Sequence, residues 1–136
     1  MIRPIVRDVL FLNRKCAEAA KEDINIGKDL MATLLHHRDH CIGLAANMIG
    51  ERKRVIAVAD GPGITVLFNP KILEKHGEYQ AEEGCLSLSG VRPATRYETI
   101  KVEGRDLNWK KVRKTFTGIT AQAVQHEMDH LEGILI

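Results

Sequence analysis

The stretch His126-Glu127-Met128-Asp129-His130 places two imidazoles four residues apart, with a carboxylate directly after the first. On a helix, residues four apart lie on the same face, one turn from each other. His126 and His130 can therefore bind one metal ion from consecutive turns. Glu127 is then placed to act as a general base on a water molecule at that ion. Because the chain has 6 histidines, a chance pattern is the alternative.

A third ligand is needed, because catalytic sites of this kind use three protein ligands and one open position for water. Only Leu131–Ile136 follow the second histidine, so we expect the third ligand upstream. Cys85 is the best candidate, since a thiolate binds soft and borderline divalent metals. Most free cysteines are instead small buried hydrophobes, and from the residue type alone that alternative stays open.

Three segments, in order along most of the chain, resemble the motifs of the peptide deformylases. Gln125–Gly133 and Glu83–Ser87 match two of these motifs in full. Cys41–Met48 matches the remaining one in part, because Cys41, Asn47 and Met48 stand where the family usually has Gly, Pro and Gln. The resemblance implies hydrolysis of the N-formyl group from the N-terminal methionine of newly made peptides.

The resemblance also implies roles for single residues. The metal ligands would be Cys85, His126 and His130, with Glu127 as the proton carrier and the Leu86 backbone N–H holding the carbonyl oxygen. Met48 takes the position of a Gln whose amide usually donates to that oxygen, and a thioether cannot donate. Loss of such a donor costs a factor of ~10²–10³ in rate. Substrate-binding positions would be Gly43, Leu44, Ile119, Gln122 and Ala123.

The expected cofactor is one divalent ion. The Cys–His–His set alone would favour zinc, whereas the resemblance implies Fe²⁺, with Zn²⁺ or Ni²⁺ as alternatives. Two further predictions concern residues around the ligands. Glu83 and Arg92 match family positions that form an ion pair beside the site, with an ordinary surface ion pair as the alternative. Gln125 and Asp129 are candidates to orient the imidazoles, with solvated side chains as the alternative.

Length and composition limit the remaining possibilities. The 136 residues predict one metallohydrolase domain, residues 1–136, and 44% hydrophobic residues suffice for one core. The net charge of +2 and 4% aromatics argue against specific nucleic-acid binding. Three cysteines, an odd number, predict free thiols and a cytoplasmic location. Neither a signal peptide nor a membrane span is expected.

The pattern of elements predicts an α+β fold. We expect a helix from Asp23 towards His40, and strands at 54–60 and 64–69 around a turn at 61–63. Pro70 should end the second strand or lie at an edge, and Gly77 should form a turn between 72–76 and 78–82. Segments 99–102 and 112–117 should pair. The last helix should begin near Thr117 or Thr120 and end at Gly133. The resemblance implies mostly antiparallel sheets around this C-terminal metal-binding helix.

Three other interpretations compete with a deformylase. Met48 favours either a metallohydrolase with a changed substrate or a catalytically impaired module that binds metal and peptide. A zinc protease is disfavoured because its usual ligand lies downstream of the second histidine. The basic run Lys110, Lys111, Arg113 and Lys114 is a candidate for transient ribosome contact, although a solvated strand face is the commoner explanation.

Overall fold

The computed structural model describes residues 1–85 and 87–135. Its strands form one antiparallel sheet in the order β1 (Gly43–Ala45), β2 (Val55–Asp60), β3 (Gly63–Cys85), β4 (Leu88–Arg105) and β5 (Lys111–Thr117). The helices are α1 (Val9–Leu12), α2 (Ile24–His36) and α3 (Gly118–Leu131), with 3₁₀ turns η1 (Lys21–Asp23) and η2 (Ala46–Ile49). The α+β prediction is confirmed, with antiparallel pairing and a C-terminal helix.

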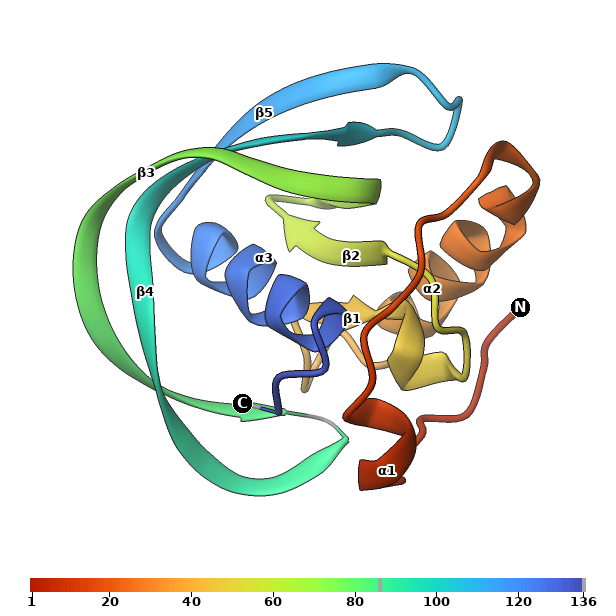
Figure 1. Cartoon of the computed structure of the whole chain (residues 1–136), viewed down its shortest axis with the longest axis horizontal. Helices are drawn as coiled ribbons and strands as arrows, with labels where there is room; N and C mark the ends of the chain where they lie inside the picture. Colours follow the sequence, from red (N-terminus) through yellow and green to blue (C-terminus); the bar gives the residue numbers. More distant parts are fainter. Residues whose placement is uncertain (86, 136) are drawn as a thin grey trace.

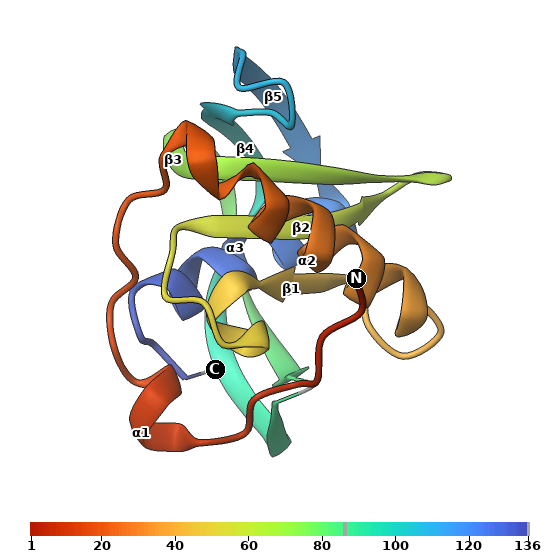
Figure 2. The same cartoon turned by 90° about the vertical axis from the view of Figure 1, so that its right-hand side faces the viewer.

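The long strands β3 and β4 curve around α3, so this helix is enclosed by the sheet (Figure 1). Both α2 and α3 contact β2, and in Figures 1 and 2 this strand lies between the two helices. Leu30 and Leu34 of α2 and Val124 of α3 are fully buried in the same hydrophobic cluster as Phe68 of β3. This arrangement places α3 against the concave face of the sheet. No helix in the described part of the chain is long and apolar enough to cross a membrane.

The prediction that the chain breaks at Pro70 and Gly77 was wrong, because β3 runs through both residues. The pairing with β4 shifts between Phe68 and Lys71, so a bulge accommodates the proline, which has no N–H to donate. Gly77 has φ +78°, and a Cβ there would lie 3.0 Å from the Cβ of Glu98 on β4. A glycine is needed here because it tolerates this backbone without a turn.

Other predicted boundaries are close to those in the structure. Segments 99–102 and 112–117 pair as expected, and α3 follows Thr117, with Gly133 beyond its end at φ +74°. The first long helix is shorter than predicted: α2 ends at His36, and a turn follows in which the His40 N–H donates to the His37 carbonyl. This turn lets the chain enter β1 at the edge of the sheet.

Candidate metal centre and its cavity

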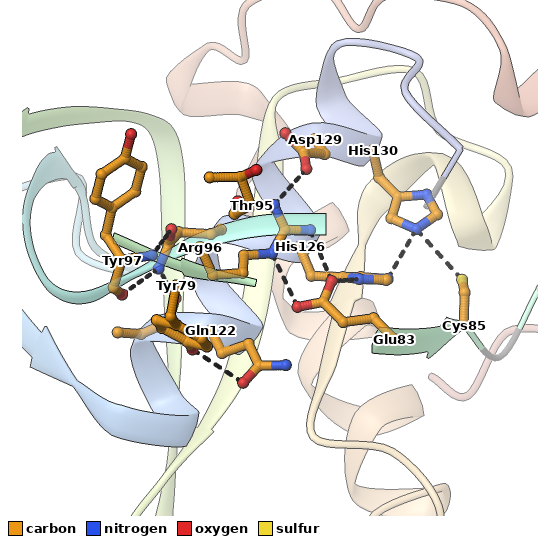
Figure 3. A network of polar contacts seen from close by, with 12 residues as sticks. Tyr79, Glu83, Cys85, Thr95, Arg96, Tyr97, Gln122, His126, Asp129 and His130 are labelled. Atoms are coloured by element: carbon orange, nitrogen blue, oxygen red, sulfur yellow. Dashed lines mark hydrogen bonds and ion pairs between the residues drawn. The ribbon is translucent and has the colours of Figure 1, made fainter. Parts of the chain in front are cut away.

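The three predicted ligands come from two elements that meet inside the fold. Cys85 is the last residue of β3, and His126 and His130 project from α3 one turn apart (Figure 3). The Cys85 Sγ lies 3.3 Å from the His130 Nε2, which lies 3.2 Å from the His126 Nε2. The ligand atoms all fall within 4.8 Å of one another, and both rings are buried. The structure therefore holds a candidate Cys–His–His metal site.

This spacing fits a divalent ion. Bonds of ~2.0–2.1 Å to nitrogen and ~2.3 Å to sulfur in a tetrahedron place neighbouring ligand atoms roughly 3.3–3.6 Å apart. The observed separations of 3.2 and 3.3 Å are close to these values. A sulfur and two imidazole nitrogens turned towards one point are the donor set expected for a soft or borderline cation.

Glu83 orients the first imidazole. Its Oε1 lies 2.8 Å from the His126 Nδ1, so a proton on Nδ1 leaves the Nε2 lone pair facing the candidate site. Hydrogen bonds from His126 and Arg96 outweigh burial and lower the pKa of Glu83 to about 2. Burial lowers the pKa of His126, but the hydrogen bonds to Cys85 and Glu83 have the larger effect and raise this pKa to about 10. A cation that binds His126 must therefore displace a proton from the imidazole.

Arg96, rather than the predicted Arg92, is the partner of Glu83. Its guanidinium donates to both Glu83 oxygens, at 2.7 and 2.9 Å, and to Asp129 at 2.8 Å. The predicted pairing with Arg92 was wrong. Arg92 does lie opposite Glu83 in the strand register, but its guanidinium donates to the Ser89 carbonyl. Arg96 is further along the same strand, where the side chain is buried and reaches α3.

Neither of the two predicted imidazole partners on α3 contacts a ligand ring. Asp129 is linked to the His126 ring only indirectly: it accepts a hydrogen bond from Arg96, which also donates to Glu83. Gln125 exchanges hydrogen bonds with the backbone N–H and carbonyl of Tyr97, and its amide also donates to the Ala121 carbonyl. Gln125 therefore ties α3 to β4, and the prediction that it orients an imidazole was wrong.

Glu127 lies beside the ligands on a cavity wall. Its Oε1 makes no hydrogen bond to any residue that the structure describes. Burial raises the pKa of this carboxyl to about 7. A Cβ at Gly43 would lie 3.0 Å from the Glu127 Oε2, so the glycine permits a close approach of β1 to this side chain. The arrangement provides a carboxyl that can exchange a proton inside the cavity.

A cavity of about 520 Å³ opens onto two of the three predicted ligands, Cys85 and His126, with His130 buried behind them. Of the predicted substrate-binding residues, Gly43, Ile119 and Gln122 line it, together with Met48, Cys85, His126 and Glu127. Leu44 and Ala123 are buried and are not among the lining residues. The predicted contribution of the Leu86 N–H falls outside the residues that the structure describes.

Two sulfur-bearing side chains besides Cys85 line the same cavity. The Met48 Sδ accepts a hydrogen bond from the Ala45 N–H at 3.4 Å. The Cys41 thiol donates to the Gly43 carbonyl at 2.8 Å, and burial raises its pKa to about 12. Both side chains stand where the chain departs from the first deformylase motif. Met48 thus has a partner of its own, but no proton to offer a substrate carbonyl.

Asn47, a third departure from that motif, touches the metal helix and was not predicted to do so. It is fully buried, and its Nδ2 donates to the His130 carbonyl at 2.9 Å. The Asn47 Oδ1 and the His130 Nδ1 have no hydrogen-bond partner among the described residues. A polar residue in place of the motif's usual Pro was the signal in the sequence that this position makes a hydrogen bond.

Known proteins with similar sequences and structures agree with these observations. A family model described as polypeptide deformylase matches residues 3–136. A peptide deformylase of Clostridium beijerinckii is 52% identical over 136 residues, covering 100% of both chains. Peptide deformylase 1 of Clostridium perfringens is 40% identical, covering 91% of this chain and 87% of that protein. A class I type b peptide deformylase from Acinetobacter baumannii, solved with Met-Ala-Ser bound, has a TM-score of 0.87 and 32% identity, and covers 99% of this chain and 97% of its own.

Proposed function

The chain belongs to the peptide deformylase family of metal-dependent amide hydrolases, and we propose that Cys85, His126 and His130 hold the metal ion with which it removes the N-formyl group from nascent peptides. The observation that carries this proposal is the convergence of one sulfur and two imidazole nitrogens within 4.8 Å of one another. The His130 nitrogen lies 3.3 Å from the Cys85 sulfur and 3.2 Å from the His126 nitrogen, and Cys85 and His126 line the cavity. The three positions also match the family's motifs residue by residue.

Glu127 is proposed to move the proton of the reaction. A divalent ion at this site would supply a Lewis acid that polarises the formyl carbonyl and lowers the pKa of a water molecule. The Glu127 carboxylate takes a proton from the attacking water and gives it to the amine nitrogen as the C–N bond breaks. The products are formate and a peptide with a free methionine amine. The Oε1 atom has no partner among the described residues and is therefore available for this transfer.

The substrate is proposed to lie along β1 with its methionine in the cavity. β1 is an edge strand, so an extended peptide can pair with its free side. Gly43 and the backbone of Leu44 would form this pairing, because the Leu44 side chain is fully buried. Ile119 and Gln122 line the cavity one to two turns before His126. The proposed roles of Ala123 and of the Leu86 N–H rest on family resemblance alone.

Fe²⁺ is the proposed metal, with Zn²⁺ or Ni²⁺ able to occupy the same donor set. The proposal rests on family resemblance together with the sulfur ligand. Metal analysis of protein purified without oxygen, and again after aerobic purification, tests it. Iron in the first sample at about one ion per chain supports the proposal, and zinc in both samples contradicts it.

Residues 1–136 are proposed to act as one domain in the cytoplasm, which is supported by a single hydrophobic cluster and three free cysteines. A transient ribosome contact would use the exposed basic run on and before β5. Lys111 and Arg113 of this run already pair with Glu103, at 2.8 and 3.6 Å, which leaves less charge for a partner. Co-sedimentation with ribosomes at low and high salt tests this contact.

Met48 favours one alternative: a hydrolase of the same type with a different acyl group as substrate. Its thioether offers no donor to the carbonyl oxygen. Rates on formyl-, acetyl- and unmodified methionyl peptides separate the two functions. Faster release of acetate than of formate would establish the alternative.

The Glu127→Gln variant tests the proposed function directly. Formate release from formyl-Met-Ala-Ser should fall by ~10²–10⁴-fold, because the amide cannot accept the proton. The metal content should stay equal to that of wild type. If both proteins are inert and both bind the formyl peptide, the chain is a metal-bearing peptide-binding module and the proposal fails.

A further inference from the structure

Gln122 on α3 has its side-chain amide held by a tyrosine of the sheet. The Tyr79 hydroxyl on β3 donates to the Gln122 Oε1 at 3.0 Å (Figure 3). Burial raises the pKa of the Tyr79 phenol, so it keeps its proton at neutral pH and acts as the donor. With its oxygen engaged, the amide has one orientation, and its NH₂ group points away from Tyr79.

That NH₂ group faces the cavity. Gln122 lines it, whereas Tyr79 does not, and in Figure 3 the nitrogen points to the side of the view that holds Glu83 and Cys85. The Gln122 Nε2 makes no hydrogen bond to any of the residues in 1–85 and 87–135. Two well-exposed apolar side chains line the same cavity: Ile119, three residues earlier on α3, and Ile42, ahead of β1. The cavity therefore combines the amide donor of Gln122 with apolar surface.

The distance along the helix matches the length of a methionine side chain. Gln122 precedes His126 by four residues, which is just over one turn, or ~6 Å along α3. In an N-formylmethionine, ordinary bond lengths place the sulfur at most roughly 6 Å from the formyl carbon. A substrate whose formyl group lies beside His126 and Glu127 can thus bring its thioether to the level of Gln122.

We infer that the Gln122 amide, oriented by Tyr79, donates a hydrogen bond to the thioether sulfur of the substrate methionine and so selects methionine over an apolar side chain of equal length. Ile119 and Ile42 contact the methylene groups, and the amide contacts the one polar atom of the side chain. The inference rests on the proposed function for the position of the formyl group. Norleucine has CH₂ in place of the sulfur and cannot accept this hydrogen bond, so we expect the Gln122 amide to disfavour it.

The test compares formyl-Met-Ala-Ser with formyl-norleucyl-Ala-Ser. In wild type, the ratio of the two kcat/KM values should favour methionine, and Gln122→Leu should lower this ratio by about two- to fivefold, the worth of one weak neutral hydrogen bond. Gln122→Glu keeps the length and the Tyr79 bond but has no donor at the ionised carboxylate, so it should lower the ratio as well. Tyr79→Phe should lower it in part, because the amide is then free to rotate.

Tyr97→Phe is the matched control, because the Tyr97 hydroxyl bonds to Glu78 on the exposed face at 3.3 Å. Its ratio should equal that of wild type. An unchanged ratio in both Gln122 variants overturns the inference, as does an equal fall in the Tyr79 and Tyr97 variants. If no formyl peptide is hydrolysed, the proposed function fails. The ratio of dissociation constants for the two peptides, measured by calorimetry on the same variants, then decides the role of Gln122 separately.

Discussion

Met48 occupies the motif position at which the family usually has a glutamine, the proposed hydrogen-bond donor to the substrate carbonyl. Its sulfur accepts from the Ala45 N–H at 3.4 Å, and the side chain is 1% exposed. A glutamine at this position has an oxygen to replace the sulfur as acceptor and an NH₂ group left over for the cavity. Met48→Gln should therefore raise kcat/KM for formate release by about tenfold or more. An unchanged kcat/KM, measured with the same metal loaded in both proteins, would mean that another group already supplies this hydrogen bond.

Arg96 carries a buried charge between two carboxylates. The Arg96 and Glu83 side chains are each 5% exposed, and their nearest atoms are 2.7 Å apart. Arg96→Met leaves the Glu83 charge buried without its partner, so the free energy of unfolding should drop by about 3–5 kcal/mol. Urea unfolding followed by circular dichroism measures this change.

Arg92→Met is the matched control, because Arg92 lies on the same strand and donates only to the Ser89 carbonyl among described residues. Its unfolding free energy should stay within about 0.5 kcal/mol of wild type. An equal decrease in unfolding free energy in the two variants would show that the Glu83–Arg96 ion pair does not stabilise the fold more than an ordinary arginine on β4.

At the scale of single residues, the sequence predicted the three candidate metal ligands that lie together but not the side chains that hydrogen-bond around them. Helical spacing alone is enough to bring His126 and His130 together, and the motif match added Cys85. Arg92 and Arg96 are both arginines on one face of β4, and only the position of α3 decides which of them reaches Glu83. Asn47 likewise depends on a contact with His130, 83 residues away in sequence.

Among the elements, α2 is attached to the sheet at a position with no spare room. A Cβ at Gly27 would lie 2.4 Å from the Phe68 Cζ and 3.1 Å from the Val66 Cγ1, and Phe68 is fully buried. Gly27→Ala should therefore destabilise the fold. Overpacking costs ~1–3 kcal/mol, which exceeds the gain of about 1 kcal/mol in helix propensity.

Thermal unfolding of Gly27→Ala measures the net effect, with Gly63→Ala as the comparison. At Gly63, the nearest atom to a new Cβ is the Asp60 carbonyl oxygen at 4.0 Å, so its stability should barely change. A Gly27→Ala protein as stable as wild type would mean that α2 can shift away from β3.

The elements were predictable where local signals agree with the fold. The pairing of 99–102 with 112–117 follows from the strand patterns, and the end of α3 shortly before Gly133 follows from a glycine that adopts a positive φ. β3 was misread because Pro70 and Gly77 are usual breakers. In this structure, pairing with β4 on one side and a bulge at Phe68–Lys71 keep the strand continuous. Such compensation comes from a partner strand, which a local pattern does not reveal.

At the scale of the whole molecule, a metal ion would join the sheet to the helix that it surrounds. Cys85 ends β3, and His126 and His130 lie on α3, so one ion closes a loop of the chain between these elements. An ion that binds only the folded state stabilises it by about 4 kcal/mol at a thousandfold excess over its dissociation constant. For a domain of this size, the apparent melting temperature should rise by roughly 10 °C or more.

Calorimetric scans with and without Zn²⁺ measure this shift, and Cys85→Ser separates the candidate site from other imidazoles. His40 lines the cavity, and His36 and His37, whose ring centroids lie 5.0 Å apart, precede it in sequence, so these three imidazoles offer a second place for a cation. If the ion joins β3 to α3, serine should abolish most of the shift, because a hydroxyl is a much poorer ligand than a thiolate. An equal shift in wild type and Cys85→Ser would place the stabilising ion at the surface histidines. The idea that a metal ion joins the sheet to α3 would then be wrong.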